Sequence, residues 1–155
     1  LLTARNTLTQ RTIGPACTGS TALELSGMKD GDFAGLCLLQ KEYGLVGVRV
    51  DGNRKTIVMI GAPGGKPVEA APIPFDQERV YFKAECDFTG KKDVADFFYS
   101  ADGKTWLPVG TRLQMVYTLP HFMGYRFGLF HYATKETGGY ADFDFFDIAE
   151  KRTQP

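Results

Sequence analysis

The sequence predicts an all-β fold, an antiparallel β-sandwich, on the basis of three observations. Short runs in which apolar and polar residues alternate occur along most of the chain. Turn signals rich in Gly, Asp, Asn and Pro separate these runs every 8 to 12 residues or so, a spacing typical of sandwiches. No window sustains a helical period, and strands do not alternate with helical segments, which argues against a parallel α/β sheet.

The clearest strand is VYFKAECDF, residues 80–88, in which Val80 and Phe82 alternate with Tyr81 and Lys83. This period of two places one face of the strand in a core. Similar runs predict strands at 21–26, 33–40, 43–51, 55–60, 95–100, 125–133 and 140–148, and the total is expected to be about ten. Residues 110–118 fit no pattern.

Length and composition bound the class of protein. The 155 residues fit one domain, 1–155, without internal repeats or linkers. Equal numbers of basic and acidic residues, 18 of each, give no sign of the clustered basic charge that nucleic-acid binding needs, so we expect no nucleic-acid partner. No apolar run is long enough for a membrane helix and no signal peptide is recognisable. The chain opens at Leu1 rather than Met, which suggests a processed product or a piece of something longer.

The three cysteines, Cys17, Cys37 and Cys86, have neither CxxC nor Cys/His spacing, so they predict neither a disulfide framework nor a zinc site. We expect all three to be free thiols, and Cys37 and Cys86 to be buried, because they lie within apolar alternations. The GAPGG segment at 61–65 lacks the Walker pattern and is expected to be a hairpin loop.

Catalytic chemistry would need two carboxylates on one strand face, as in a retaining glycosidase. Two candidate pairs exist, Glu85 with Asp87 and Asp142 with Asp144. The first stands on the polar side of an ordinary strand, where a solvated charged face is the simpler explanation, and the second faces outward. His131 lies in no recognisable nucleophile motif. The sequence therefore predicts no catalytic residue.

The segment from 118 to 148 is unusually rich in aromatic residues, which form either core or a ligand surface. Alternation predicts that Phe143 and Phe145 face the core, whereas Asp142, Asp144 and Phe146 face outward. Outward aspartates beside aromatic rings can accept sugar hydroxyls, bind calcium or simply be solvated. The aromatic residues left available for partners are Phe122, Tyr140 and either Tyr125 or Tyr132.

Five longer strings carry a resemblance to a known family: NTLTQRTIGP (6–15), SGMKDGDFAGLCLLQKEYGLVGV (26–48), YFKAECDF (81–88), FFYSADGKTW (97–106) and YTLPHFMGYRFGLFHYATKETGGYADFDFF (117–146). In this order they resemble the C-terminal concanavalin-like β-sandwich, of the xylan-binding type, in family 43 glycoside hydrolases. These enzymes are β-xylosidases and α-arabinofuranosidases. The resemblance implies a jelly-roll sandwich that belongs to a larger enzyme and lacks the family's opening strand.

The resemblance also implies how such a domain works. The family's catalytic carboxylates sit on an N-terminal propeller, so we expect the isolated chain not to be an enzyme. Its expected partners are that propeller and xylan or xylo-oligosaccharide. One loop of the family's sandwich helps to close the active site with an aromatic ring, and the PHFMG turn at 120–124 takes its place here. His121 and Phe122 are the candidate residues of this loop.

Sugar binding combines aromatic rings with polar groups that take the hydroxyls. The candidate carbohydrate-binding residues are Gln40, Tyr43, Arg49, Arg126 and Asp144. No cofactor is predicted; if calcium binds, Asp142 should contribute, and we expect weak binding or none. A structural sandwich without a ligand and a free-standing glycosidase are the alternatives. Polysaccharide degradation predicts a secreted or periplasmic protein, while unpaired cysteines are also compatible with the cytoplasm.

Overall fold

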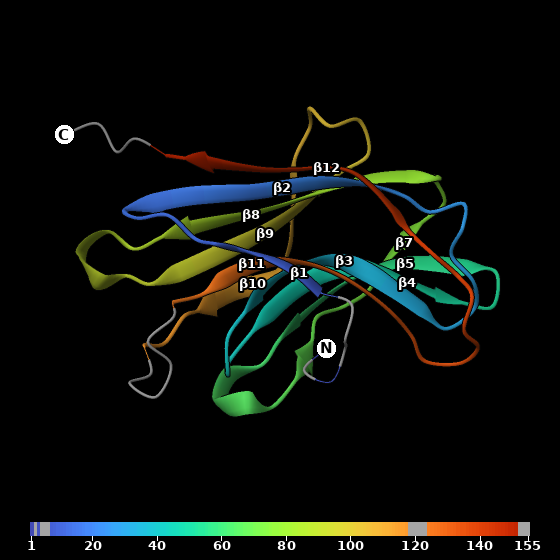
Figure 1. The fold of residues 1–155 in the computed structure, drawn as a ribbon, viewed down its shortest axis with the longest axis horizontal. Helices are drawn as coiled ribbons and strands as arrows, with labels where there is room; N and C mark the ends of the chain where they lie inside the picture. Colours follow the sequence, from blue (N-terminus) through green and yellow to red (C-terminus); the bar gives the residue numbers. More distant parts are fainter. Residues whose placement is uncertain (2, 4–6, 118–123, 152–155) are drawn as a thin grey trace.

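The structure is a computed structural model that describes residues 1, 3, 7–117 and 124–151. Strands dominate it (Figure 1). In chain order they are β1 (Thr7–Arg11), β2 (Ala16–Glu24), β3 (Asp32–Leu39), β4 (Gly44–Asp51), β5 (Arg54–Gly61), β6 (Val68–Glu69), β7 (Ile73–Phe75), β8 (Arg79–Asp87), β9 (Val94–Ser100), β10 (Leu107–Gln114), β11 (Arg126–Ala133) and β12 (Asp142–Glu150). Two short 3-10 turns lie at Pro63–Gly65 and Thr89–Lys91. Within the part of the chain that the structure describes, no helix is long and apolar enough to cross a membrane.

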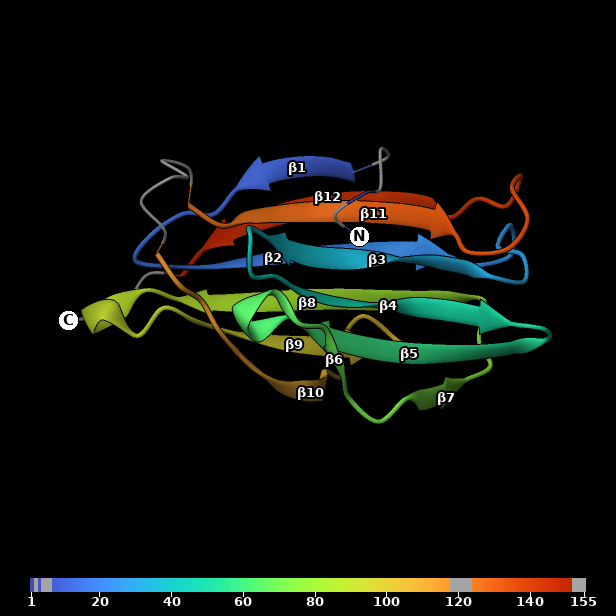
Figure 2. The same cartoon turned by 90° about the horizontal axis from the view of Figure 1, so that it is seen from below.

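The strands form two antiparallel sheets that pack face to face, which confirms the predicted sandwich. The seven-stranded sheet has the order β1-β11-β3-β4-β5-β6, with β7 also paired to β5. The five-stranded sheet has the order β10-β9-β8-β2-β12. Figure 1 shows the two layers edge-on, and Figure 2 looks onto the seven-stranded sheet, with β1, β11, β3, β4 and β5 following one another.

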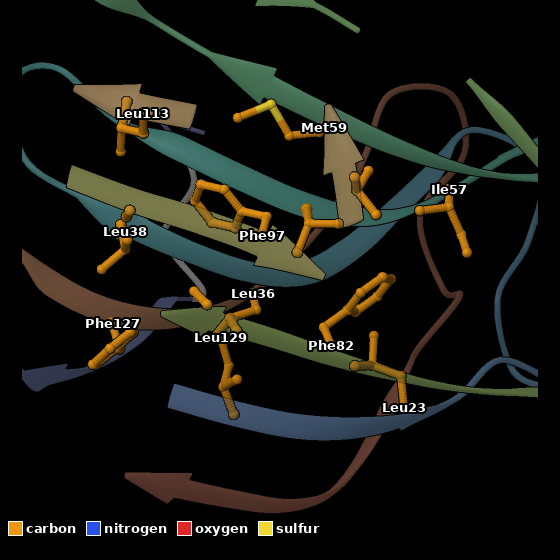
Figure 3. Close-up of a cluster of buried hydrophobic side chains, with 14 of the residues drawn as sticks. Leu23, Leu36, Leu38, Ile57, Met59, Phe82, Phe97, Leu113, Phe127 and Leu129 are labelled. Carbon is orange, nitrogen blue, oxygen red and sulfur yellow. The ribbon is translucent and has the colours of Figure 1, made fainter. Parts of the chain in front are cut away.

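Alternating side chains from both sheets fill the space between them (Figure 3). On β8, Val80, Phe82, Ala84 and Cys86 are buried while their neighbours are not, as the sequence predicted. The fully buried aromatic rings of Phe82, Phe97 and Phe127 lie among leucine, isoleucine and methionine side chains. Each such side chain stabilises the fold by about 1.5–3 kcal/mol relative to an exposed position.

One end of the sandwich gathers several connections that are distant in sequence. Ala62 donates its N–H to the carbonyl of Tyr43 at 2.8 Å, and Met115 donates to the carbonyl of Asp93 at 2.7 Å. Thr12 donates its hydroxyl to the carbonyl of Tyr125 at 2.9 Å. We call this end the loop end; it comprises residues 12–15, 40–43, 62–67, 88–93, 115–117 and 124–125. The candidate loop residues His121 and Phe122 lie outside the described residues.

The prediction for the last strand was wrong at two aromatic residues. The register between β12 and β2 shifts between Phe143 and Phe145, because a bulge adds one residue to β12. Beyond the bulge the alternation is reversed, so Phe145 is 39% exposed and Phe146 packs against the core. Phe143 packs against the core as predicted, and Asp142 and Asp144 are exposed.

Candidate functional site

The outer face of the seven-stranded sheet, directed away from the five-stranded sheet, carries a second apolar cluster. We call it the outer cluster; its buried members are Phe33, Cys37, Tyr43, Leu45, Val58, Ala62 and Phe130. Tyr132, Leu39, Ile60 and Leu1 pack against it. The seven buried side chains are at most 7% exposed, so other parts of the chain already cover them, and the partly buried side chains around them, such as Tyr132, are the ones that a ligand can reach.

The strand register arranges the outer cluster in rows across the sheet. One row runs Tyr132–Phe33–Arg49 over β11, β3 and β4, and the next runs from Phe130 through Gly35 to Gly47. The Phe33 ring lies edge-on to Phe130 and Tyr132, with centroid distances of 5.3 and 5.6 Å. Such geometry is favoured by the quadrupoles of the rings.

Glycine is required beneath these rings. A Cβ atom at Gly47 would lie 2.9 Å from Cε2 of Phe33, and one at Gly35 would lie 2.1 Å from the carbonyl oxygen of Val46. The two glycines face each other across β3 and β4. Gly35 and Gly47 therefore let β3 and β4 approach closely, and Gly47 leaves room for the Phe33 ring on the sheet backbone, where it forms a buried aromatic base with Phe130.

A fixed guanidinium group stands at the margin of this base. Arg49 donates to both carboxylate oxygens of Glu69, at 2.9 and 2.8 Å. These hydrogen bonds raise the pKa of Arg49 and lower the pKa of Glu69. A bidentate pair of this kind fixes the plane of the guanidinium. Arg49 also interacts electrostatically with Tyr132, which lies in the same row on the other side of Phe33.

The hydroxyl groups of Tyr43 and Tyr132 are further polar groups at the outer cluster. Burial raises the pKa of Tyr132 and of Tyr43, so both keep their phenolic protons at neutral pH. The two hydroxyls are close enough to influence each other electrostatically. Tyr43 is only 7% exposed, whereas Tyr132 is half-buried. Between Tyr125 and Tyr132, which the sequence left open, Tyr132 is therefore the one available to a partner; Tyr125 is buried in the core.

The remaining candidates divide between this face and the opposite sheet. Arg126, paired with Leu39 in register, donates its Nε–H to the hydroxyl of Thr9 at 2.9 Å. Gln40 follows at the loop end. Asp144, by contrast, lies on the five-stranded sheet and pairs with Arg79, which also binds Glu24. The structure thus brings Tyr43, Arg49 and Arg126 to one face, with Gln40 at its end, and separates Asp144 from them.

Glu85 and Asp87, the first carboxylate pair considered for catalysis, are both ion-paired with lysines. Burial acts to raise the pKa of Glu85, but hydrogen bonds from Lys151 and Lys83 outweigh it and lower that pKa. The Thr89 hydroxyl and Lys92 lower the pKa of Asp87. A general acid of a glycosidase needs a raised pKa instead.

The structure adds little support for a metal site. Asp142 is exposed at the start of β12. Across residues 1, 3, 7–117 and 124–151, no three His, Cys, Asp or Glu side chains gather closely enough to hold a metal ion.

Sequence reasoning missed Glu69 and the aromatic base of Phe33 and Phe130. The signal for the base was present in β3, whose sequence DFAGLCLL is apolar at nearly every position and buried throughout except at its last residue. A continuous apolar run indicates a strand covered on both faces, whereas alternation indicates one covered face. No local pattern marks Glu69, because its partner lies 20 residues away.

Comparison with known proteins identifies the family of the chain. The model of the beta-xylosidase C-terminal concanavalin A-like domain matches residues 1–149. A beta-xylosidase of Formosa agariphila is 30% identical over 144 residues, which are 92% of this chain and 23% of that protein.

Solved structures agree with this match. A bifunctional GH43-CE protein of Bacteroides eggerthii has a TM-score of 0.90 and 57% identity, over 97% of this chain and 19% of that one. An engineered GH43 glycoside hydrolase with endo-xylanase and exo-arabinofuranosidase activity has a TM-score of 0.86 and 31% identity, over 94% of this chain and 31% of that one. The chain thus spans a third or less of each of these proteins. With its two antiparallel sheets, it belongs to the family of beta-xylosidase C-terminal concanavalin A-like domains of GH43 enzymes.

Proposed function

We propose that this chain is the non-catalytic accessory domain of a larger family 43 glycoside hydrolase that acts on xylan-type saccharides, and that the outer face of its seven-stranded sheet binds xylo-oligosaccharide. The beta-xylosidase relative and the GH43 hydrolase with endo-xylanase activity support the substrate class. Because such a substrate is a polysaccharide, we also propose that the protein is secreted or periplasmic.

The observation that carries the proposal is the half-buried ring of Tyr132 in one row with the partly exposed guanidinium of Arg49, with Phe33 buried between them. A sugar ring presents an apolar face, which an aromatic surface can cover, and hydroxyl groups, which need hydrogen-bonding partners. The guanidinium has five N–H groups, and the pair with Glu69 uses two of them. Since Glu69 also fixes the orientation of Arg49, a saccharide would meet donors that are already in position.

Replacing Arg49 with Ala should weaken the binding of xylohexaose by roughly tenfold or more, because a hydrogen bond to a charged group contributes about 1.5–3 kcal/mol. Isothermal titration calorimetry measures this change. Arg112 offers a matched control, since it also forms a bidentate pair, donating from Nε and Nη2 to Asp96 at 2.9 and 2.7 Å on the five-stranded sheet. Arg112→Ala should leave the affinity unchanged. Equal losses in the two variants, or no binding by the parent chain, would refute a site on this face.

The PHFMG turn remains a proposal for a second role, that of closing the active site of a neighbouring catalytic propeller with Phe122. The described residues beside this turn support it. Met115 and Tyr125 are both buried, and the Val116 N–H donates to the Tyr125 hydroxyl at 3.3 Å. Tyr117, by contrast, is 73% exposed. Buried residues therefore lie on both sides of the segment 118–123 in the sequence, and the ring of Tyr117 just before it is exposed.

A further inference from the structure

Two of the three cysteines lie directly opposite each other. Cys17 on β2 and Cys86 on β8 are register partners in the five-stranded sheet. Both side chains face the core and are buried, with 0% and 2% of their surface exposed. Nothing in the spacing of 69 positions between them along the chain reveals this pairing, which only the fold creates.

The backbone geometry of this pair suits a disulfide. Two hydrogen bonds fix the pattern of the ladder between β2 and β8. The N–H of Phe88 donates to the carbonyl of Pro15 at 2.9 Å, and Pro15 lies two positions before Cys17. The N–H of Leu25 donates to the carbonyl of Glu78 at the other end of the ladder. Hydrogen-bonded pairs recur at every second position, so Cys17 and Cys86 form such a pair, with Cα atoms about 5.5 Å apart. Disulfides span Cα distances of about 4.4–6.8 Å.

The two sulfur atoms already interact. A hydrogen bond from the Cys86 thiol lowers the pKa of Cys17 to about 7, despite its burial, and the Ile13 N–H, at 3.3 Å from the Cys17 sulfur, adds to this effect. The same contact raises the pKa of Cys86. Cys17 is therefore the more readily ionised thiol of the pair, and the thiolate is the nucleophilic form of cysteine. Burial instead raises the pKa of Cys37 to about 12, so this thiol stays protonated.

We propose that Cys17 and Cys86 are a redox-active pair that forms a reversible disulfide in an oxidising compartment. The oxidant is a disulfide, either of low molecular weight or on an exchange protein. The Cys17 thiolate attacks one of its sulfur atoms and displaces a thiolate, which gives a mixed disulfide. Cys86 then loses its proton to solvent and attacks the Cys17 sulfur, and the second thiolate leaves. Two protein thiols are oxidised as one disulfide is reduced.

Access to Cys17 runs through the connection between β1 and β2. Ile13, whose backbone N–H binds the sulfur, is 42% exposed. At Gly14, a Cβ atom would have no neighbour within 4 Å, so the segment borders open space at this position. A small opening of residues 12–15 exposes the thiolate without separating β2 from β8. The resulting cross-link would join two adjacent strands and restrict the unfolded chain, which stabilises the fold.

The test is to refold the chain from urea in glutathione buffers of graded ratio, so that access does not limit the reaction. Free thiols are then alkylated with N-ethylmaleimide under denaturing conditions and counted by intact mass. The reduced chain takes up three groups, one for each cysteine. In oxidising buffer we expect one group, on the peptide that contains Cys37, together with a disulfide-linked peptide pair from Cys17 and Cys86. Dithiothreitol should restore all three.

Variants separate this outcome from non-specific oxidation. Cys37→Ser should still lose both of its remaining thiols, whereas Cys86→Ala should keep two thiols or carry glutathione on Cys17. Three alkylated cysteines in every buffer, or a disulfide that includes Cys37, would overturn the proposal. Because the readout is a thiol count, it does not depend on whether the outer face of the seven-stranded sheet binds a saccharide.

Discussion

Phe127→Ala should lower the free energy of unfolding by about 3–5 kcal/mol. The Phe127 ring is fully buried between the sheets and lies so close to Gly19 that a Cβ atom there would be 2.6 Å from the ring. Removing the ring would leave a cavity that the two rigid sheets cannot close. Urea unfolding followed by circular dichroism measures the loss.

Phe145→Ala is the matched control for Phe127, because both remove a phenyl ring from a strand. Phe145 lies beyond the bulge of β12 and is 39% exposed, so its loss should cost less than about 1 kcal/mol. Equal costs for the two variants would show that the bulge is misplaced and that Phe145 faces the core.

Gly35→Ala should destabilise the chain by about 3 kcal/mol, as the addition of one methyl group to a packed site does in unfavourable cases. The new Cβ would lie 2.1 Å from the carbonyl oxygen of Val46 and 2.5 Å from Cα of Gly47. Both atoms belong to the backbone of β4, so β3 and β4 must move apart. Because Phe33 packs on this backbone between Tyr132 and Arg49, the movement would also displace these side chains, and it should weaken xylohexaose binding.

Gly14→Ala provides the comparison for Gly35, since a Cβ at Gly14 meets nothing within 4 Å. It should change the free energy of unfolding by less than about 0.5 kcal/mol, as surface substitutions generally do. If Gly35→Ala proved equally mild in the same urea experiment, the close approach of β3 and β4 would not be required, and the account of the aromatic base would fail.

The local alternation of apolar and polar residues was sufficient to predict most of the strands. VYFKAECDF alternates without interruption, and β8 has the buried face that this alternation predicts. The pattern failed where the backbone departs from a regular strand. In β10 the register shifts between Val109 and Leu113, and Gly110 has a φ of 68°, so the stretch beginning at 110 showed no usable alternation.

The candidate site was predictable only in part. Residue types typical of sugar binding drew attention to Tyr43, Arg49 and Arg126, and the fold places them on one sheet face. Asp144 was chosen on the same reasoning but pairs with Arg79 on the other sheet. Which sheet a strand joins depends on long-range pairing, and this pairing leaves no mark in a local sequence pattern.

The most direct test of saccharide binding by the outer face is an NMR titration of the chain with xylohexaose. The proposal predicts that the backbone amides of β3, β4 and β11 around Phe33, Arg49 and Tyr132 shift in a saturable manner. Amides around Arg79 and Asp144 on the five-stranded sheet should stay in place. Shifts confined to the five-stranded sheet, or none at millimolar saccharide, would contradict it.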